Sequence, residues 1–195
     1  MSNRSTSLRT MTQLALLLAL EVVLTFTPLG FILIPPIAIT ILHIPVIIGG
    51  ILLGYGSGAF LGAAFGVLSM LRAATSGNPG DILFNPFASG NPLGSIAMAV
   101  LPRVLLGLVA VWVYRRLKGH ATSLVAIGAA SVCACLVHSL GVLGLMSILF
   151  ASFPLKDIFF IIIGYNGLIE LAAAVVISTA VCQAVLASRR KPGMV

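Results

Sequence analysis

Long apolar segments with almost no acidic residues recur along the chain, and they restrict its fold more than any other feature. Of the 195 residues, 59% are hydrophobic and 8% are charged, whereas about a quarter of the residues of a soluble domain are charged. Apolar segments of this length suit α-helices that cross the ~30 Å hydrocarbon core of a bilayer. The sequence therefore predicts an all-α polytopic membrane protein that forms a single domain over residues 1–195.

Six transmembrane helices are predicted from these segments. Their approximate ranges are 10–27, 37 or 41 to 53, 57–71, 93–114, 121–150, and a last span that follows residues 156–157 and ends near 187. If the N-terminus is cytoplasmic, eight of the eleven Lys and Arg residues lie on the inner side. Arg72 and Lys156 then lie outside, and Arg103 lies within the membrane. The positive-inside rule therefore predicts that both termini are cytoplasmic.

Several other classes of protein and site are disfavoured. The net charge of +7 does not indicate nucleic-acid binding, because no basic stripe with interleaved aromatic residues is present. Cys133, Cys135 and Cys182 fall inside predicted spans and lack the spacing of a disulfide framework or a metal site. No HExxH, GxSxG or Walker motif occurs. We therefore expect no metal, no cofactor and no catalytic residue, and any ATP-driven step must come from another chain.

Three connections are placed on the outer side by this topology. Residues 29–40 form an apolar, proline-rich segment that contains Pro35 and Pro36, and we interpret it as an ordered lid. Residues 72–92 form the long extracellular loop, in which Phe84 and Phe87 are too apolar for a fully solvated loop. The third connection contains Phe153 and Pro154. Together these connections predict a site that opens outward.

Ionisable side chains within the spans need a partner or a function, because burying them in hydrocarbon is costly. Arg103, His138 and Glu170 lie nine to twelve residues from the predicted outer ends of their spans, about 13–18 Å deep. They form either an Arg103–Glu170 ion pair that locks helices together or the floor of a polar pocket. Asn166 lies four residues before Glu170, on the same helix face. His43 is interpreted as a structural hydrogen-bonding residue at a helix start.

A set of short motifs occurs in a defined order along the chain. They are the small-residue surface of Ala15 and Ala19, then Phe26–Gly30, Ile34–Pro36, Leu42–Gly49, the Gly62–Gly66 region, Phe84–Pro86 and Pro102–Arg103. In this order they resemble the substrate-binding (S) components of energy-coupling-factor (ECF) transporters along nearly the whole chain. An AxxxA motif alone is weak evidence, whereas the ordered set is specific to that superfamily.

The resemblance implies a function and a set of partners. It implies a six-helix protein of the cell membrane that binds a vitamin in an outward-opening pocket, formed by the extracellular loops and the last three spans. It further implies that Ala15 and Ala19 dock a transmembrane coupling subunit, that two ATPases supply the energy, and that the S component topples to release its substrate inside. The expected substrate-binding residues are Ile34, Asn85, Arg103, His138, Asn166 and Glu170.

The substrate itself is less restricted by the sequence. The segment from Thr40 to Gly49 most resembles pantothenate-type S components, with folate-type relatives close behind, and riboflavin and thiamine are further alternatives. Arg103 and His138 suit a carboxylate ligand, whereas Glu170 and Glu21 favour a cationic vitamin such as thiamine unless they are already paired. Two other classes are an intramembrane enzyme, which requires a converging catalytic pair, and a structural scaffold, which requires no outward pocket.

Overall fold

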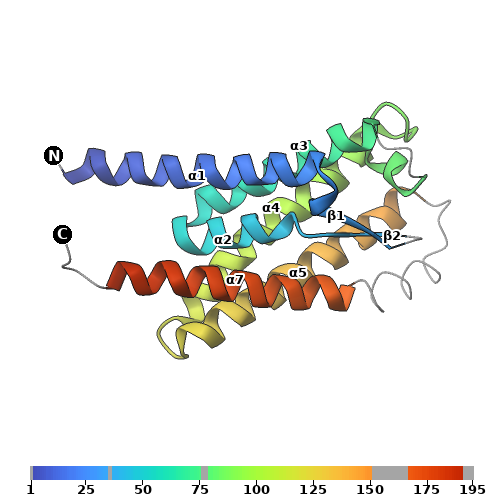
Figure 1. Ribbon diagram of the computed structural model, residues 1–195. Helices are drawn as coiled ribbons and strands as arrows, with labels where there is room; N and C mark the ends of the chain where they lie inside the picture. Colours follow the sequence, from blue (N-terminus) through green and yellow to red (C-terminus); the bar gives the residue numbers. More distant parts are fainter. Residues whose placement is uncertain (1, 35–36, 76–78, 151–166, 191–195) are drawn as a thin grey trace.

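The computed structural model describes residues 2–34, 37–75, 79–150 and 167–190 as a bundle of helices (Figure 1). The helices are α1 (Ser2–Phe26), α2 (His43–Leu53), α3 (Tyr55–Thr75), α4 (Pro92–Leu117), α5 (Ser123–Leu149) and α7 (Gly167–Arg190). Two short 3-10 helices, η1 (Pro28–Gly30) and η2 (Pro79–Phe84), and two strands, β1 (Phe31–Ile34) and β2 (Ile37–Thr40), complete the described elements. All the described helices except α2, η1 and η2 are long and apolar enough to cross a membrane.

Helix α2 departs from the predicted second span. Its 11 residues measure about 16 Å at 1.5 Å per residue, which is shorter than the ~30 Å hydrocarbon core. It begins only at His43 because Ile37 to Thr40 are extended, and it ends at Gly54, whose φ of 103° favours glycine. Nine of its residues are buried, and it contacts α1, α3, α4 and α7. The described chain therefore has five helices of spanning length and not six.

The segment predicted as a lid contains the two strands. β1 and β2 pair in antiparallel register, with Phe31 opposite Thr40 and Ile34 opposite Ile37. The all-α prediction is therefore confirmed for the bundle, and the segment expected to be extended adds a short two-stranded hairpin to it. Pro35 and Pro36 lie outside the described residues, as does the side chain of Ile34.

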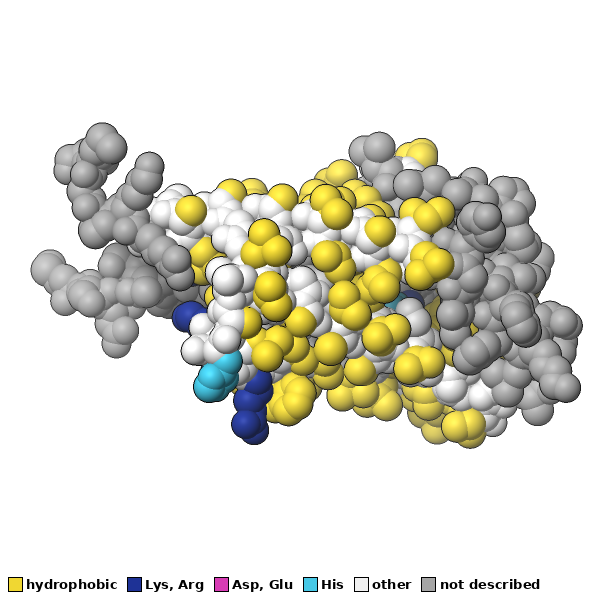
Figure 2. All heavy atoms as spheres, turned by 90° about the horizontal axis from the view of Figure 1, so that it is seen from below, with side chains coloured by type: hydrophobic (Ala, Val, Ile, Leu, Met, Phe, Trp, Pro, Cys, Tyr) yellow, Lys and Arg dark blue, Asp and Glu magenta, His cyan; other side chains and the backbone are white. Residues whose placement is uncertain are grey.

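The two ends of the bundle differ. Both termini, the α2–α3 turn and the α4–α5 turn lie at one end, whereas the hairpin and η2 lie at the other (Figure 1). At the terminal end, Arg189 of α7 donates to the Leu52 carbonyl over 3.4 Å and to Oε1 of Gln13 over 3.1 Å. These bonds join α7 to α2 and α1. On the face shown in Figure 2, the side chains between the two ends are mostly apolar, and Lys, Arg and His side chains are visible near the end with the termini.

The predicted outer loop of residues 72–92 contains more secondary structure than expected. Helix α3 continues through Arg72 to Thr75, whose hydroxyl donates to the Arg72 carbonyl over 3.0 Å. Helix η2 follows, and α4 begins at Pro92 with Asn91 as its N-cap, whose side chain accepts from the Gly94 amide over 3.0 Å. Asparagine at the N-cap followed by proline is a favoured helix start. Among the described residues of the range, 85–91 form loop.

Glycines bring α3 and α4 into backbone contact, as their four-residue spacing predicts. A Cβ atom built on Gly66 would lie 2.7 Å from the Ala99 carbonyl oxygen, and one built on Gly58 would lie 3.0 Å from that of Gly107. A Cβ on Gly62 would overlap the Arg103 carbonyl. Small residues at four-residue intervals allow such close approach between membrane helices. The crossing therefore fixes the position of Arg103 in the bundle.

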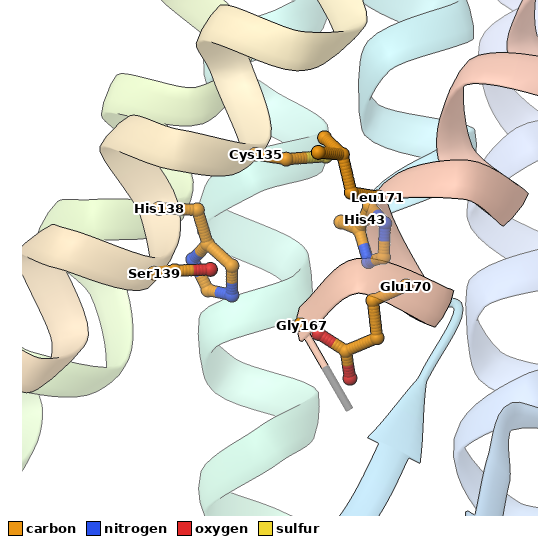
Figure 3. A pocket seen from close by; sticks show the side chains of 7 residues that line it. All are labelled: His43, Cys135, His138, Ser139, Gly167, Glu170 and Leu171. Atoms are coloured by element: carbon orange, nitrogen blue, oxygen red, sulfur yellow. The ribbon is translucent and has the colours of Figure 1, made fainter. Parts of the chain in front are cut away.

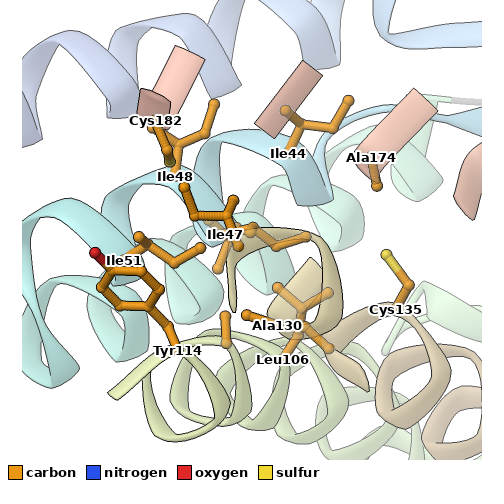
Figure 4. Close-up of a cluster of buried hydrophobic side chains, with 14 of the residues drawn as sticks. Ile44, Ile47, Ile48, Ile51, Leu106, Tyr114, Ala130, Cys135, Ala174 and Cys182 are labelled. Atoms are coloured by element: carbon orange, nitrogen blue, oxygen red, sulfur yellow. The ribbon is translucent and has the colours of Figure 1, made fainter. Parts of the chain in front are cut away.

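The largest buried cluster lies around α2, between α4, α5 and α7 (Figure 4). It includes Ile47 of α2, Leu106 of α4, Ala130 of α5 and Ala174 of α7. Helix α2 therefore serves as a packing centre near the start of α7. That position brings its first residue, His43, close to α5 and α7.

Candidate functional site

A small polar pocket lies where α2, α5 and α7 meet (Figure 3). Its cavity volume is about 10 Å³, which is near the lower limit for one water molecule. The pocket therefore has room for no more than about one water molecule in the conformation described. The residues that line it are His43, Cys135, His138, Ser139, Gly167, Glu170 and Leu171.

Two histidines supply buried hydrogen-bonding groups to the pocket. His43 is 2% exposed and His138 is 8% exposed. In the described part of the chain, Nδ1 of His138 has no hydrogen-bond partner, and the ring of His43 interacts only with the backbone of Thr40 and Glu170, without a hydrogen bond of good geometry. Leaving such groups buried and unsatisfied costs about 1–3 kcal/mol each. A bound molecule with hydroxyl or amide groups would recover that cost, which makes this pocket a candidate ligand site.

His43 was not among the residues predicted to bind a ligand. The sequence favoured a structural hydrogen bond at a helix start, and the ring does interact with the backbone of Thr40 and Glu170. The structure also places the imidazole in the pocket wall. One signal was available, because His43 follows an extended apolar segment directly and is an ionisable residue in an apolar stretch. Its neighbours on α5 and α7, which give it this role, are about 90 or more residues away in sequence.

Glu170 contributes the carboxylate of the pocket. It lies in the first turn of α7, and its Oε1 accepts a hydrogen bond from the backbone amide of Thr40 over 2.5 Å. Thr40 ends β2, so this bond joins the hairpin to α7. A carboxylate at a helix N-terminus is also stabilised by the helix dipole. Glu170 therefore accepts from the protein with one oxygen and leaves the other beside the pocket.

Arg103 does not line the pocket and does not pair with Glu170. Its Nη1 donates to the carbonyls of Met98 over 3.1 Å and Ala99 over 2.8 Å, on its own helix. Pro102 has no amide to offer the Met98 carbonyl, so the guanidinium takes the place of the missing donor. The ion pair considered from the sequence is therefore absent between these two described side chains.

Two aromatic rings complete the surroundings of Arg103. Its guanidinium carbon lies 4.7 Å from the ring centre of Phe65 and 5.1 Å from that of Phe84. The ring of Phe65 also lies 5.9 Å from the ring of His138. Phe65 therefore joins Arg103 to the pocket wall, and Phe84 joins it to η2 at the hairpin end of the bundle. Nε of Arg103 is buried and has no partner among the described residues.

The remaining predicted site residues are placed as follows. Asn85 follows η2, and its side chain accepts from the Phe87 amide over 2.9 Å; it is not a lining residue of the pocket. Asn166 lies outside the described residues, and Ile34 is described by its backbone alone. Of the six predicted residues, the pocket therefore brings His138 and Glu170 together.

Helix α1 presents its small residues outward. Ala15 and Ala19 are exposed, whereas Glu21 is fully buried. Neither carboxylate oxygen of Glu21 has a partner within the described ranges. The outer face of α1 is thus free, within this chain, to contact lipid or another protein.

Comparison with known proteins places the chain in a family. A family model described as "ECF transporter, substrate-specific component" matches residues 9–189. The pantothenic acid transporter PanT of Lactococcus lactis is 33% identical over 163 residues, covering 79% of this chain and 81% of that protein. The pantothenate transporter PanT of Leuconostoc mesenteroides is 28% identical over 157 residues, covering 73% and 72%.

The family match extends over all five helices of spanning length. Such helices in a transporter component indicate a multi-pass protein of the cell membrane. The small-residue surface of α1, the hairpin and the buried Pro102–Arg103 pair all fall within the matched range. The chain belongs to the family of substrate-specific components of ECF transporters.

Proposed function

We propose that this chain is the subunit that captures pantothenate outside the cell for an ATP-powered ECF transporter. The observation that carries the proposal is its similarity to two proteins named as pantothenate transporters, over more than 70% of each chain. Folate, riboflavin and thiamine are the alternative substrates. An intramembrane enzyme has less support, since the family is one of transporter components.

The pocket chemistry supports a ligand with this set of groups. Pantothenate carries hydroxyls, an amide and a carboxylate. The ring nitrogens of His43 and His138 in the pocket wall suit hydroxyl and amide groups, and the second oxygen of Glu170 can accept from a hydroxyl. Arg103, with a free Nε, is proposed to attract the carboxylate, because a guanidinium pairs well with carboxylates. Since the cavity is small, binding requires the pocket to widen.

Three further residues are proposed to complete the site from the outer side. Ile34 belongs to the hairpin, Asn85 follows η2, and Asn166 directly precedes α7. The hairpin and η2 lie at the same end of the bundle (Figure 1). We propose that residues 29–40 act as a lid and that the loop within 72–92 forms the other side of the mouth.

The topology supports six crossings with both termini in the cytoplasm. Both termini lie at one end of the bundle (Figure 1), which requires an even number of crossings. The hairpin and α2 together return the chain from the end of α1 to the start of α3, so they replace one long helix. Four basic residues lie at or next to the C-terminal ends of α4 and α7, at the end of the bundle that holds the termini: Arg115, Arg116, Lys118 and Arg189. This suits a cytoplasmic face.

The energy for uptake is proposed to come from partner chains. We propose that Ala15 and Ala19 dock a transmembrane coupling subunit, which connects the chain to two ATPases. Exposed small residues on a helix allow another helix to approach closely. A15L and A19L should therefore prevent assembly with the coupling module while leaving pantothenate binding intact. V176L, on the exposed face of α7, is the control, and equal assembly of all three variants would contradict this docking site.

Titration of the purified protein with four vitamins tests the substrate. We expect pantothenate to bind at one molecule per chain, and folate, riboflavin and thiamine not to bind at the same concentrations. Tight binding of one of the other vitamins would assign the chain to that substrate. Binding of none of the four would contradict a vitamin-binding role.

A further inference from the structure

One hydrogen bond connects the pocket to the hairpin. The Thr40 amide donates to Oε1 of Glu170 over 2.5 Å, between residues 130 positions apart. Thr40 is the last residue of β2, and Glu170 lies in the first turn of α7. Strand β2 and α7 are in contact, and Figure 3 shows the Glu170 side chain directed toward the strand.

The Thr40 amide finds its acceptor on α7, because the hydrogen bonds at the base of the hairpin are made by other amides. The Ile41 amide donates to the Gly30 carbonyl over 3.2 Å, and the Ile44 amide donates to the Ile41 carbonyl over 3.1 Å. A strand edge presents amides that must be paired when they are buried. At Thr40 a side chain from another helix, and not a further strand, supplies the acceptor. The end of the hairpin is therefore fastened by one carboxylate.

The same carboxylate belongs to the pocket. Glu170 lines it together with His43 and His138, and His43 follows Thr40 by only three residues. A ligand in the pocket therefore contacts the same carboxylate, that of Glu170, that holds the hairpin. A movement of the hairpin would in turn shift Glu170 and the start of α2.

We propose that Glu170, besides the contact with substrate proposed above for its second oxygen, fastens the β1–β2 hairpin through Oε1 and thereby sets how fast the substrate leaves the pocket. This inference rests on the proposed function for the identity of the substrate, but the fastening itself can be measured without substrate. In this proposal, what matters is that the Glu170 side chain is long enough to place an acceptor oxygen at the Thr40 amide. Its negative charge is secondary.

Four variants separate the effects of side-chain length, of charge and of losing a buried acid elsewhere in the bundle. E170M removes the acceptor at similar length. E170D keeps the charge but is one methylene shorter, so its carboxylate withdraws from the Thr40 amide. E170Q keeps an acceptor oxygen at the original reach and removes the charge. E21Q replaces another buried acid by its amide, at a residue that lies on α1 and is not a pocket residue.

The first measurement is hydrogen exchange of the Thr40 amide in the substrate-free protein in lipid nanodiscs. We expect exchange to accelerate at least about tenfold in E170M and E170D, which corresponds to about 1.4 kcal/mol. E170Q should change it less, and E21Q should leave it unchanged. Unchanged exchange in both E170M and E170D would overturn the fastening. If E170M does not fold, E170D and E170Q still decide between reach and charge.

The second measurement is the dissociation rate of radiolabelled pantothenate from the same variants. We expect E170D and E170M to release it at least about tenfold faster, with E170Q closer to the unmodified chain. Accelerated amide exchange with an unchanged dissociation rate would overturn the role in release. If the chain does not bind pantothenate, the proposed function fails, while the exchange measurement still tests the Glu170–Thr40 bond.

Discussion

Arg103 supplies the hydrogen-bond donor that Pro102 removes from α4. The proline leaves the Met98 carbonyl without its helical amide, and Nη1 of Arg103 donates to that carbonyl over 3.1 Å. Prolines are tolerated in membrane helices when neighbouring groups satisfy the freed carbonyls. The buried cation therefore has a structural role within α4, in addition to the attraction of a carboxylate that we propose for it.

A double-mutant cycle tests this relationship. We expect R103M to lower the free energy of unfolding, because the Met98 carbonyl is left buried without a donor. In the P102A background residue 102 regains its amide, so the same R103M change should cost about 1 kcal/mol less. Thermal unfolding in detergent of the four proteins gives the coupling. Equal costs of R103M in both backgrounds would contradict the account.

The α3–α4 crossing predicts a contrast between two kinds of glycine. G107A and G62A should each destabilise the protein by about 1–3 kcal/mol, because the added methyl meets backbone atoms that cannot move independently. G144A on α5 is the matched control, since nothing lies within 4 Å of its added Cβ and alanine favours the helix. Thermal unfolding should show a loss for the first two and no loss for the third. A loss that is the same for all three would argue against a close crossing.

The pocket histidines should contribute to binding while an exterior histidine does not. H43A and H138A each remove a hydrogen-bonding group from the pocket, and each should weaken pantothenate binding by about tenfold, as expected for one or two hydrogen bonds. H120A is the control, because His120 is exposed beyond the end of α4. Calorimetric titration measures all three. Unchanged affinity in both pocket variants would place the site elsewhere.

Phe84 is expected to hold η2 against the bundle through Arg103. F84L removes a ring whose centre lies 5.1 Å from the guanidinium carbon, and a desolvated contact of this kind contributes up to about 2 kcal/mol. Amide exchange of residues 81–90 should therefore accelerate in F84L. Phe87 is 97% exposed, so F87L serves as the control with no change. Identical exchange in the two variants would show that the Arg103 contact does not restrain the loop.

The sequence predicts the long helices well because hydropathy and length determine which segments can span a bilayer. It does not reveal that α2 is short, because a buried short helix and an extended apolar strand together have the same hydropathy as a span. The sequence also does not reveal which groups Arg103 contacts. Its partner depends on a carbonyl freed by Pro102 and on rings from α3 and η2, whereas opposite charge and similar depth favoured Glu170.

The pocket could be predicted in part for a similar reason. His138 and Glu170 stand out as ionisable residues within apolar segments, so their involvement follows from the cost of burial. His43 carries the same signal, but a helix start offers a structural explanation, and only the packing of α5 and α7 around its ring places it in the pocket wall. The Glu170–Thr40 bond joins a side chain to a backbone amide, and no pattern of residue types marks such a bond.

The most direct test of pantothenate capture is mass spectrometry of small molecules released from the protein after purification in mild detergent. The account predicts pantothenate at about one molecule per chain, and its loss in the folded H43A/H138A double variant with retention in H120A. A different vitamin at that stoichiometry would contradict pantothenate as the substrate. An empty protein that also fails to bind added pantothenate would contradict the central claim.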